Sequence, residues 1–255
     1  MTEEEKPIRE EEDFMNAMAY HSQLLCEIMS LFKIYCGMCG EHATEMEPAM
    51  ARAIFFTIFG SIEASLRVLA AGTLFVDVAP EAENDPSDSK TRKKLTESEK
   101  QFLRQESEEL SPRDWNPRQR TKYVSFQDAL IGYPTIYARL FGIDLSIDKS
   151  CSEWQDFMKL KQLRDIGAHG NSNELRNSPE SMRILYKDIK RLLECRLWYC
   201  KQLENLPWIM KVNAKGEIDF LNRLLEAGFS ETCRRIRGER YAQQDKFSRR
   251  KKPRG

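Results

Sequence analysis

The longest apolar run of the sequence extends from Ala49 to Ala71, and three charged residues interrupt it: Arg52, Glu63 and Arg67. A run of this length could span a bilayer, but the hydrocarbon interior makes three charges costly. We therefore expect no membrane partner. The run instead predicts a helix, beginning at about Met46, that is buried at the centre of the protein.

A second long helix is predicted to pack against this one. Apolar residues such as Phe14 and Phe32 recur at helical spacing from Asp13 to Gly37. Gly37 and Gly72 each follow the last periodic residue of a run, where glycine commonly ends a helix. Two long helices joined by a short connection are typical of an antiparallel helical hairpin.

The rest of the chain favours helices as well. Helical periodicity returns over residues 126–141, 154–163 and 179–205, and Thr96-Glu97-Ser98-Glu99 resembles a capping box before a short helix over 98–109. No long segment alternates apolar and polar residues as a strand would. The predicted fold class is all-α: an up-down helical bundle with a long insertion between the helix pairs and a C-terminal helical extension.

Charge and composition predict four parts of the chain. Residues 1–12 are predicted to be an acidic flexible arm. Residues 13–206 are predicted to form the helical domain, with its insertion at about residues 75–150. Residues 207–245 form the helical extension, and residues 246–255 a basic tail.

The basic tail contains Arg249, Arg250, Lys251 and Lys252. These cations could hold RNA through its phosphates, without reading its sequence. The alternatives are a disordered tail without a ligand, or contact with the acidic arm of a second chain.

Composition excludes several classes of protein. The formal net charge is zero, so no overall positive field favours nucleic acid. The acidic beginning does not resemble a secretory signal, and seven cysteines indicate reduced thiols and a cytoplasmic location. Cys36 and Cys39 form one C-x-x-C pair near His42, but no second pair completes a zinc site, so no metal is expected.

The candidate site is the stretch Leu163-Arg164-Asp165-Ile166-Gly167-Ala168-His169-Gly170, which follows an apolar-periodic helix. Gly167 and Gly170 are predicted to stop or kink that helix. A guanidinium and a titratable imidazole close together suit a phosphodiester, because Arg164 neutralises phosphate oxygens and His169 moves a proton. The alternative is that both side chains only cap the carbonyl end of the helix.

The stretch, together with the helices around it, resembles the HEPN superfamily (higher eukaryotes and prokaryotes nucleotide-binding). The family signature is Arg, four to six residues, then His, with a polar residue directly after the Arg; here four residues intervene and Asp165 is the polar residue. The resemblance covers about residues 10–205. Its long insertion is most similar to the RiboL-PSP and MAE-like HEPN proteins.

The resemblance implies a metal-independent endoribonuclease that needs no cofactor and works as a homodimer. In such an enzyme His169 would activate the ribose 2′-OH or protonate the leaving oxygen, and Arg164 would stabilise the phosphorane. Asp165 would orient these groups, and the product would be a 2′,3′-cyclic phosphate. The family also implies a defence or toxin role, with an antitoxin or regulatory protein as a possible partner.

Glu63 is the one acid inside the apolar run, and a buried acid normally needs a cation. We therefore predict that Glu63 lies beside the catalytic groups and pairs with Arg164 or His169. The alternative is an exposed pair with Arg67, four residues later.

Two other functions stay open. A HEPN module without activity would bind RNA, a nucleotide or a protein partner. Residues 225–237 also resemble a helix-turn-helix, so the C-terminal helices could belong to a DNA-binding regulator.

Overall fold

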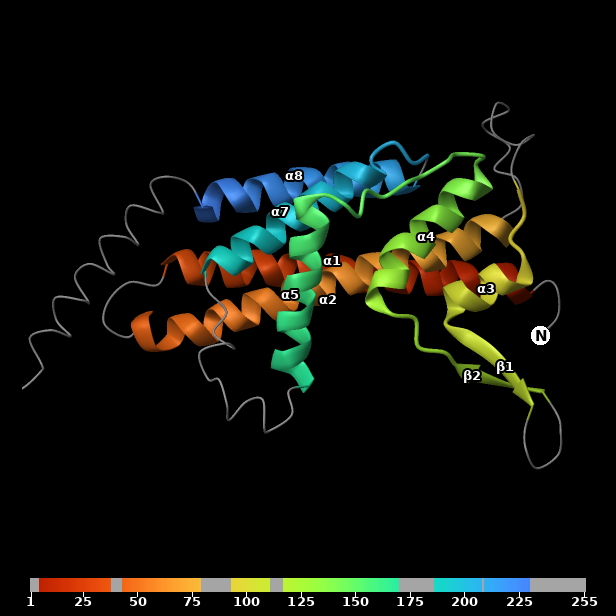
Figure 1. Cartoon of the computed structure of the whole chain (residues 1–255), viewed down its shortest axis with the longest axis horizontal. Helices are drawn as coiled ribbons and strands as arrows, with labels where there is room; N and C mark the ends of the chain where they lie inside the picture. Colours follow the sequence, from red (N-terminus) through yellow and green to blue (C-terminus); the bar gives the residue numbers. More distant parts are fainter. Residues whose placement is uncertain are drawn as a thin grey trace, which may run out of the picture.

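The computed structural model describes residues 5–37, 43–78, 93–110, 117–169, 186–207 and 209–229. In this part the chain forms an all-α helical bundle with one small antiparallel hairpin of strands (Figure 1). The helices are α1 (Glu5–Gly37), α2 (Ala43–Val78), α3 (Glu97–Arg104), α4 (Phe126–Leu140), α5 (Ser152–His169), α7 (Tyr186–Leu203) and α8 (Ile209–Phe229). The strands are β1 (Glu106–Leu110) and β2 (Pro117–Thr121).

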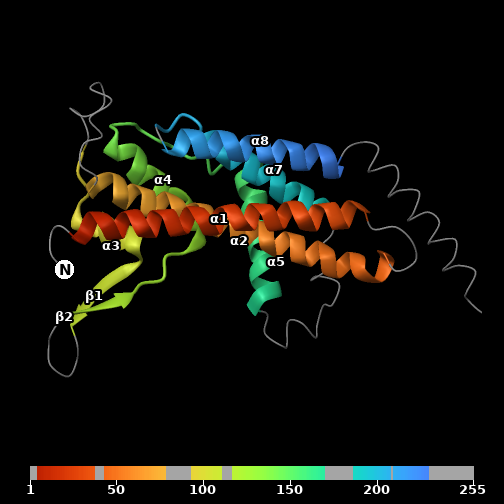
Figure 2. The same cartoon turned by 180° about the vertical axis from the view of Figure 1, so that it is seen from behind.

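The helices α1 and α2 form the predicted antiparallel hairpin along the long axis of the molecule (Figures 1 and 2). On one side α7 packs against α2 and α8 packs against α7, while α4 and α3 lie along the C-terminal half of α2. In both views α5 runs across the direction of α1 and α2, and it packs against α7. The fold therefore brings α5 next to the middle of α2.

The apolar run of α2 is buried by its neighbours. Its segment Ala49–Val78 is long and apolar enough to cross a membrane. The most apolar 18-residue stretch of this segment has a mean hydropathy of 1.6, and 61% of that stretch is buried inside the protein. Three aromatic rings from three helices meet on it: Phe59 lies 6.0 Å from Phe126 of α4 and 6.3 Å from Phe157 of α5. These rings fix α4 and α5 on the same part of α2.

Two predicted helix ends were wrong. The chain is already helical from Glu5, so residues 5–12 are not a flexible arm; Glu10 is only 6% exposed and receives a hydrogen bond from Arg104 of α3. Helix α2 continues past Gly72 to Val78. A Cβ at Gly72 would lie 3.1 Å from the Phe14 ring, so this glycine allows α1 and α2 to approach closely and does not end the helix.

The short helix of the insertion begins as predicted and ends earlier. Thr96 and Glu99 form the capping box of α3. Gln105 then adopts the left-handed conformation, with φ 56°, which ends the helix, and β1 and β2 follow where no strand was expected. Glu106 pairs with Thr121 in their register. The insertion is also part of the core, because Leu130, Tyr133 and Tyr137 of α4 are at most 1% exposed.

A buried arginine joins four helices. Arg196 of α7 is 1% exposed and donates to Glu217 of α8 and, at 2.5 Å, to Ser61 of α2. Its Nη2 lies 3.4 Å from Nε2 of His21 on α1. Because a buried charge without a partner is strongly destabilising, these contacts hold α8 on the bundle.

We expect Glu217→Leu to reduce the free energy of unfolding by about 3–5 kcal/mol, because the substitution leaves Arg196 buried without its carboxylate. The double variant Arg196→Met, Glu217→Leu should recover most of that loss. Urea denaturation measures both. Lys190→Ala, which removes only a surface pair with Glu194, is the control and should cost less than about 1 kcal/mol; an equal cost for Glu217→Leu would contradict the prediction.

The same cluster predicts a pH dependence of stability. Burial lowers the pKa of His21, Glu217 raises it and Arg196 lowers it further, so the pKa lies below its ordinary value of 6.5. The folded state therefore binds fewer protons than the unfolded state, and stability falls as the pH drops below about 6.5. Urea unfolding between about pH 7.5 and 5.5 should show this slope. The slope should become smaller in His21→Gln, and an unchanged slope in that variant would exclude His21 as its source.

Candidate catalytic site

Arg164, on the last two turns of α5, reaches across to α2. Its Nη2 donates to Oε1 of Glu63 at 2.6 Å, a contact between residues 101 positions apart in the chain. The contact predicted between Glu63 and Arg164 is therefore present. Among the residues that the structure describes, Glu63 forms no ion pair with Arg67. Glu63 is less buried than its place in the apolar run suggested, because 38% of its side chain is exposed, against 23% for Arg164.

Asp165 holds the same guanidinium from its own helix. Its Oδ1 accepts from Arg164 Nη1 at 3.1 Å, and its Oδ2 lies 2.5 Å from Nζ of Lys161, one turn earlier. Partial burial raises the pKa of Asp165, but the hydrogen bonds from Lys161 and Arg164 outweigh burial and lower it below its usual range. Asp165 is thus a stable carboxylate and a weak base near neutral pH, which suits an orienting role and not proton abstraction.

These four side chains form a neutral network, defined as Glu63, Lys161, Arg164 and Asp165. Sequence reasoning missed Lys161, although its place four residues before Asp165 on a helix is the usual signal of a pair. A guanidinium has five N–H donors. Glu63 and Asp165 hold one terminal nitrogen each, so Arg164 is fixed in orientation and keeps donors for a further oxyanion.

Other contacts fix α5 itself. Asp156 Oδ2 accepts from Nε of Arg191 on α7 at 2.8 Å, and the rings of Trp154 and Trp198 lie 6.5 Å apart, close to edge-on. These contacts join the first half of α5 to α7 and thereby set where its second half, with Arg164, meets α2.

His169 is the last residue of α5, and its side chain lies outside the described residues. The helix continues through Gly167, so the prediction of a stop or kink at that residue was wrong. On a regular helix, positions five residues apart are separated by a rise of about 7.5 Å and a rotation of about 140°. The joint role of Arg164 and His169 stays a prediction.

Several other predicted residues also lie outside the described part of the chain. These are the basic residues Arg249, Arg250, Lys251 and Lys252, the helix-turn-helix candidate beyond Phe229, and the residues Cys39 and His42. In the described part, no group of three or more His, Cys, Asp or Glu side chains could hold a metal ion. Burial raises the pKa of Cys195 to about 12 and that of Cys200 well above its usual value, so both thiols stay protonated.

No protein-family model matches the chain, and neither a curated protein nor a solved structure shows a match to it.

The Glu63–Arg164 pair is partly exposed, so we expect it to contribute little to stability. Arg164→Ala and Glu63→Gln should each change the free energy of unfolding by about 1 kcal/mol or less, with a favourable coupling below about 1 kcal/mol in the double-mutant cycle. Urea denaturation of the four proteins measures the coupling. A loss of several kcal/mol would show instead that the pair is a main support of the fold.

Proposed function

We propose that the protein is a metal-independent endoribonuclease of the HEPN type that works in the cytoplasm as a homodimer. The observation that carries this proposal is the fixed guanidinium of Arg164, held by Glu63 from α2 and by Asp165 from α5. Arginine held in this way stabilises charge without having to reorganise during the reaction. The Arg-x4-His resemblance supplies the reaction, and the geometry of Arg164 supports its electrostatic part.

In the proposed reaction the ribose 2′-oxygen attacks the adjacent phosphorus, and His169 accepts the proton of the 2′-hydroxyl. The P–O2′ bond forms while the P–O5′ bond breaks. Arg164 stabilises the negative charge that builds up on the phosphorane oxygens. A protonated imidazole, from His169 of either protomer, returns a proton to the departing 5′-oxygen, which leaves a 2′,3′-cyclic phosphate and a 5′-hydroxyl. The basic residues 249–252 would hold the RNA nearby through phosphate contacts.

A second candidate is a HEPN module without activity that binds RNA, a nucleotide or a protein partner. The neutral network favours it, because two carboxylates already balance the charges of Arg164 and Lys161. In this alternative the pair with Glu63 only attaches α5 to α2, and the protein acts through a surface of the bundle.

We expect the purified protein to cleave RNA in the presence of EDTA and to leave cyclic phosphate ends. His169→Ala and Arg164→Ala should each reduce the rate by roughly 100-fold or more, because each removes proton transfer or charge stabilisation. Gel analysis of a labelled RNA, with mass spectrometry of its ends, measures both effects.

Lys159→Ala is the matched control, since Lys159 lies on the same helix and pairs only with the surface residue Asp156 in the described structure. It should cleave like the parent. Intact RNA with the parent protein, or parental rates in both variants, would reject the nuclease. Unchanged RNA affinity in the same two variants would then favour the binding module.

A further inference from the structure

The structure contains a second polar site, on the other half of α2. A cavity of about 320 Å³ opens between α1, α2, α3, β1 and α4. Its volume is at the lower end of the range typical of small-molecule sites. Leu74 and Leu103 supply part of its apolar wall, while Arg67, Arg104, Gln105 and Tyr133 bring polar groups to it. None of these polar residues belongs to the neutral network around Arg164.

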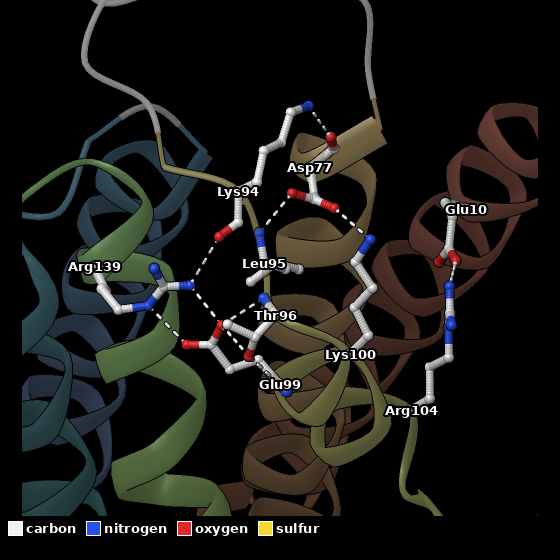
Figure 3. A network of polar contacts seen from close by, with 9 residues as sticks. All are labelled: Glu10, Asp77, Lys94, Leu95, Thr96, Glu99, Lys100, Arg104 and Arg139. Carbon is white, nitrogen blue, oxygen red and sulfur yellow. Dashed lines mark hydrogen bonds and ion pairs between the residues drawn. The ribbon is translucent and has the colours of Figure 1, made fainter.

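The walls of this cavity are held by polar contacts that come from four elements (Figure 3). Asp77 at the end of α2 accepts from the backbone N–H of Leu95 at 2.9 Å and pairs with Lys100 of α3 at 3.0 Å. Glu99 of α3 pairs with Arg139 of α4, with Arg139 Nε 2.7 Å from Glu99 Oε1. Helix α3 is thus attached to α2 and α4, which fixes its position in the wall of the cavity.

Tyr133 is a buried polar group whose donor is left without an acceptor. Its side chain is 1% exposed, and its hydroxyl accepts a hydrogen bond from Nε2 of Gln105 at 3.0 Å. Among the described residues, no acceptor receives the hydroxyl proton of Tyr133. Buried hydroxyls normally satisfy their donor. Tyr133 and its partner Gln105 both line the cavity, so we expect the missing acceptor to be a ligand in the cavity.

Gln105 is held in place for this contact. It has the left-handed φ of 56°, which is uncommon for a residue other than glycine, and its carbonyl accepts from the N–H of Lys122 at 2.6 Å. Its backbone conformation at the end of α3 lets the side-chain amide reach Tyr133. The amide occupies a lone pair of the hydroxyl, which leaves the proton of Tyr133 available to a ligand.

Arg67 adds a positive charge to the same place. Arg67 and Tyr133 both line the cavity. Burial raises the pKa of Tyr133 above its ordinary value, and the hydrogen bond from Gln105 and the charge of Arg67 offset only part of that rise. Within the described residues Arg67 makes no ion pair and no hydrogen bond. The other charges at the cavity are largely balanced: Arg104 pairs with Glu10 at 2.6 Å and Arg9 with Asp13 at 3.9 Å.

We propose that this cavity binds a small organic anion, whose carboxylate or phosphate oxygens accept from Arg67 and from the hydroxyl of Tyr133. A buried hydroxyl donor without an acceptor and an exposed guanidinium in the wall of the same cavity suit an anionic oxygen, because hydrogen bonds to charged groups are strong. The carboxylate of Glu106, which also lines the cavity, makes no ion pair or hydrogen bond with another described residue. The negative charge of Glu106 disfavours a polyanion. It favours a ligand whose end opposite the anionic group carries an ammonium or hydroxyl donor. The argument for this site does not rest on the proposed RNA cleavage.

The test uses the full chain with ¹³C-labelled tyrosine rings, and Tyr133→Phe assigns the Tyr133 signal. The protein is titrated with ribose 5-phosphate, with L-glutamate and with sodium chloride at matched ionic strength. We expect a saturable movement of the Tyr133 signal with ribose 5-phosphate or with L-glutamate. The ligand that binds identifies the anionic group as a phosphate or a carboxylate. Sodium chloride should give no saturation.

Calorimetry with the anion that binds tests the two donors. Arg67→Gln and Tyr133→Phe should each weaken its affinity about tenfold or more, since each removes a hydrogen bond to a charged group. Arg52→Ala is the matched control: it removes another exposed arginine of α2 that does not line the cavity, and it should bind like the parent. Thermal unfolding confirms that each variant is folded.

The proposal is overturned if neither anion moves the Tyr133 signal to saturation, or if Arg67→Gln and Tyr133→Phe, both folded, bind as tightly as the parent. Binding that Arg52→Ala weakens as much as Arg67→Gln would also overturn it, because the attraction would then come from the general charge of α2.

Discussion

Burial of α2 is the constraint on which the rest of this structure depends. A 36-residue helix with a long apolar run cannot remain in water, and α1, α3, α4 and α7 all pack against it. Such a helix offers neighbours a common surface along its whole length. The hairpin with α1 uses one side, and the aromatic contacts of Phe59 with Phe126 and Phe157 bring α4 and α5 to another. Segments far apart in the chain therefore meet because each covers a different part of one helix.

Charged contacts add specificity to this apolar arrangement. Hydrophobic burial is non-directional, so it does not by itself choose the rotation or the register of a packed helix. Glu63 fixes where α5 crosses α2, and Arg196 fixes α8 against α7 and α1. These two differ in energetic role. Arg196 is almost fully buried, so removing one of its partners leaves a buried charge without compensation. The Glu63–Arg164 pair stays in contact with solvent, so its loss should change the free energy of unfolding only slightly.

The parts of the fold that depend on local sequence patterns could be predicted from the sequence. Periodicity predicted the α1–α2 hairpin, the spacing of Thr96 and Glu99 predicted a cap, and an acid within an apolar run led to the Glu63–Arg164 contact. Prediction failed where tertiary contacts decide. Gly72 resembles a helix end in the sequence, but its position is set by the approach of α1. The strands depend on the left-handed turn at the end of α3, for which glutamine gives no signal. Arg196 had a readable signal, since it follows Leu192 by four residues on the buried face of α7, as Glu63 lies among apolar residues in α2.

The position of Arg67 has a consequence for how the two halves of the molecule relate. Arg67 follows Glu63 by one turn of α2, so the cavity donor and the partner of Arg164 share a rigid segment of one helix. Two ligands that each bias the same element influence one another, and thermodynamic linkage makes that influence equal in both directions. An anion bound at Arg67 in the proposed cavity site would change the electrostatic field at Glu63, one turn away on the same helix. Through this one turn of α2, an anion in the proposed cavity site and the orientation of Arg164 by Glu63 would be coupled.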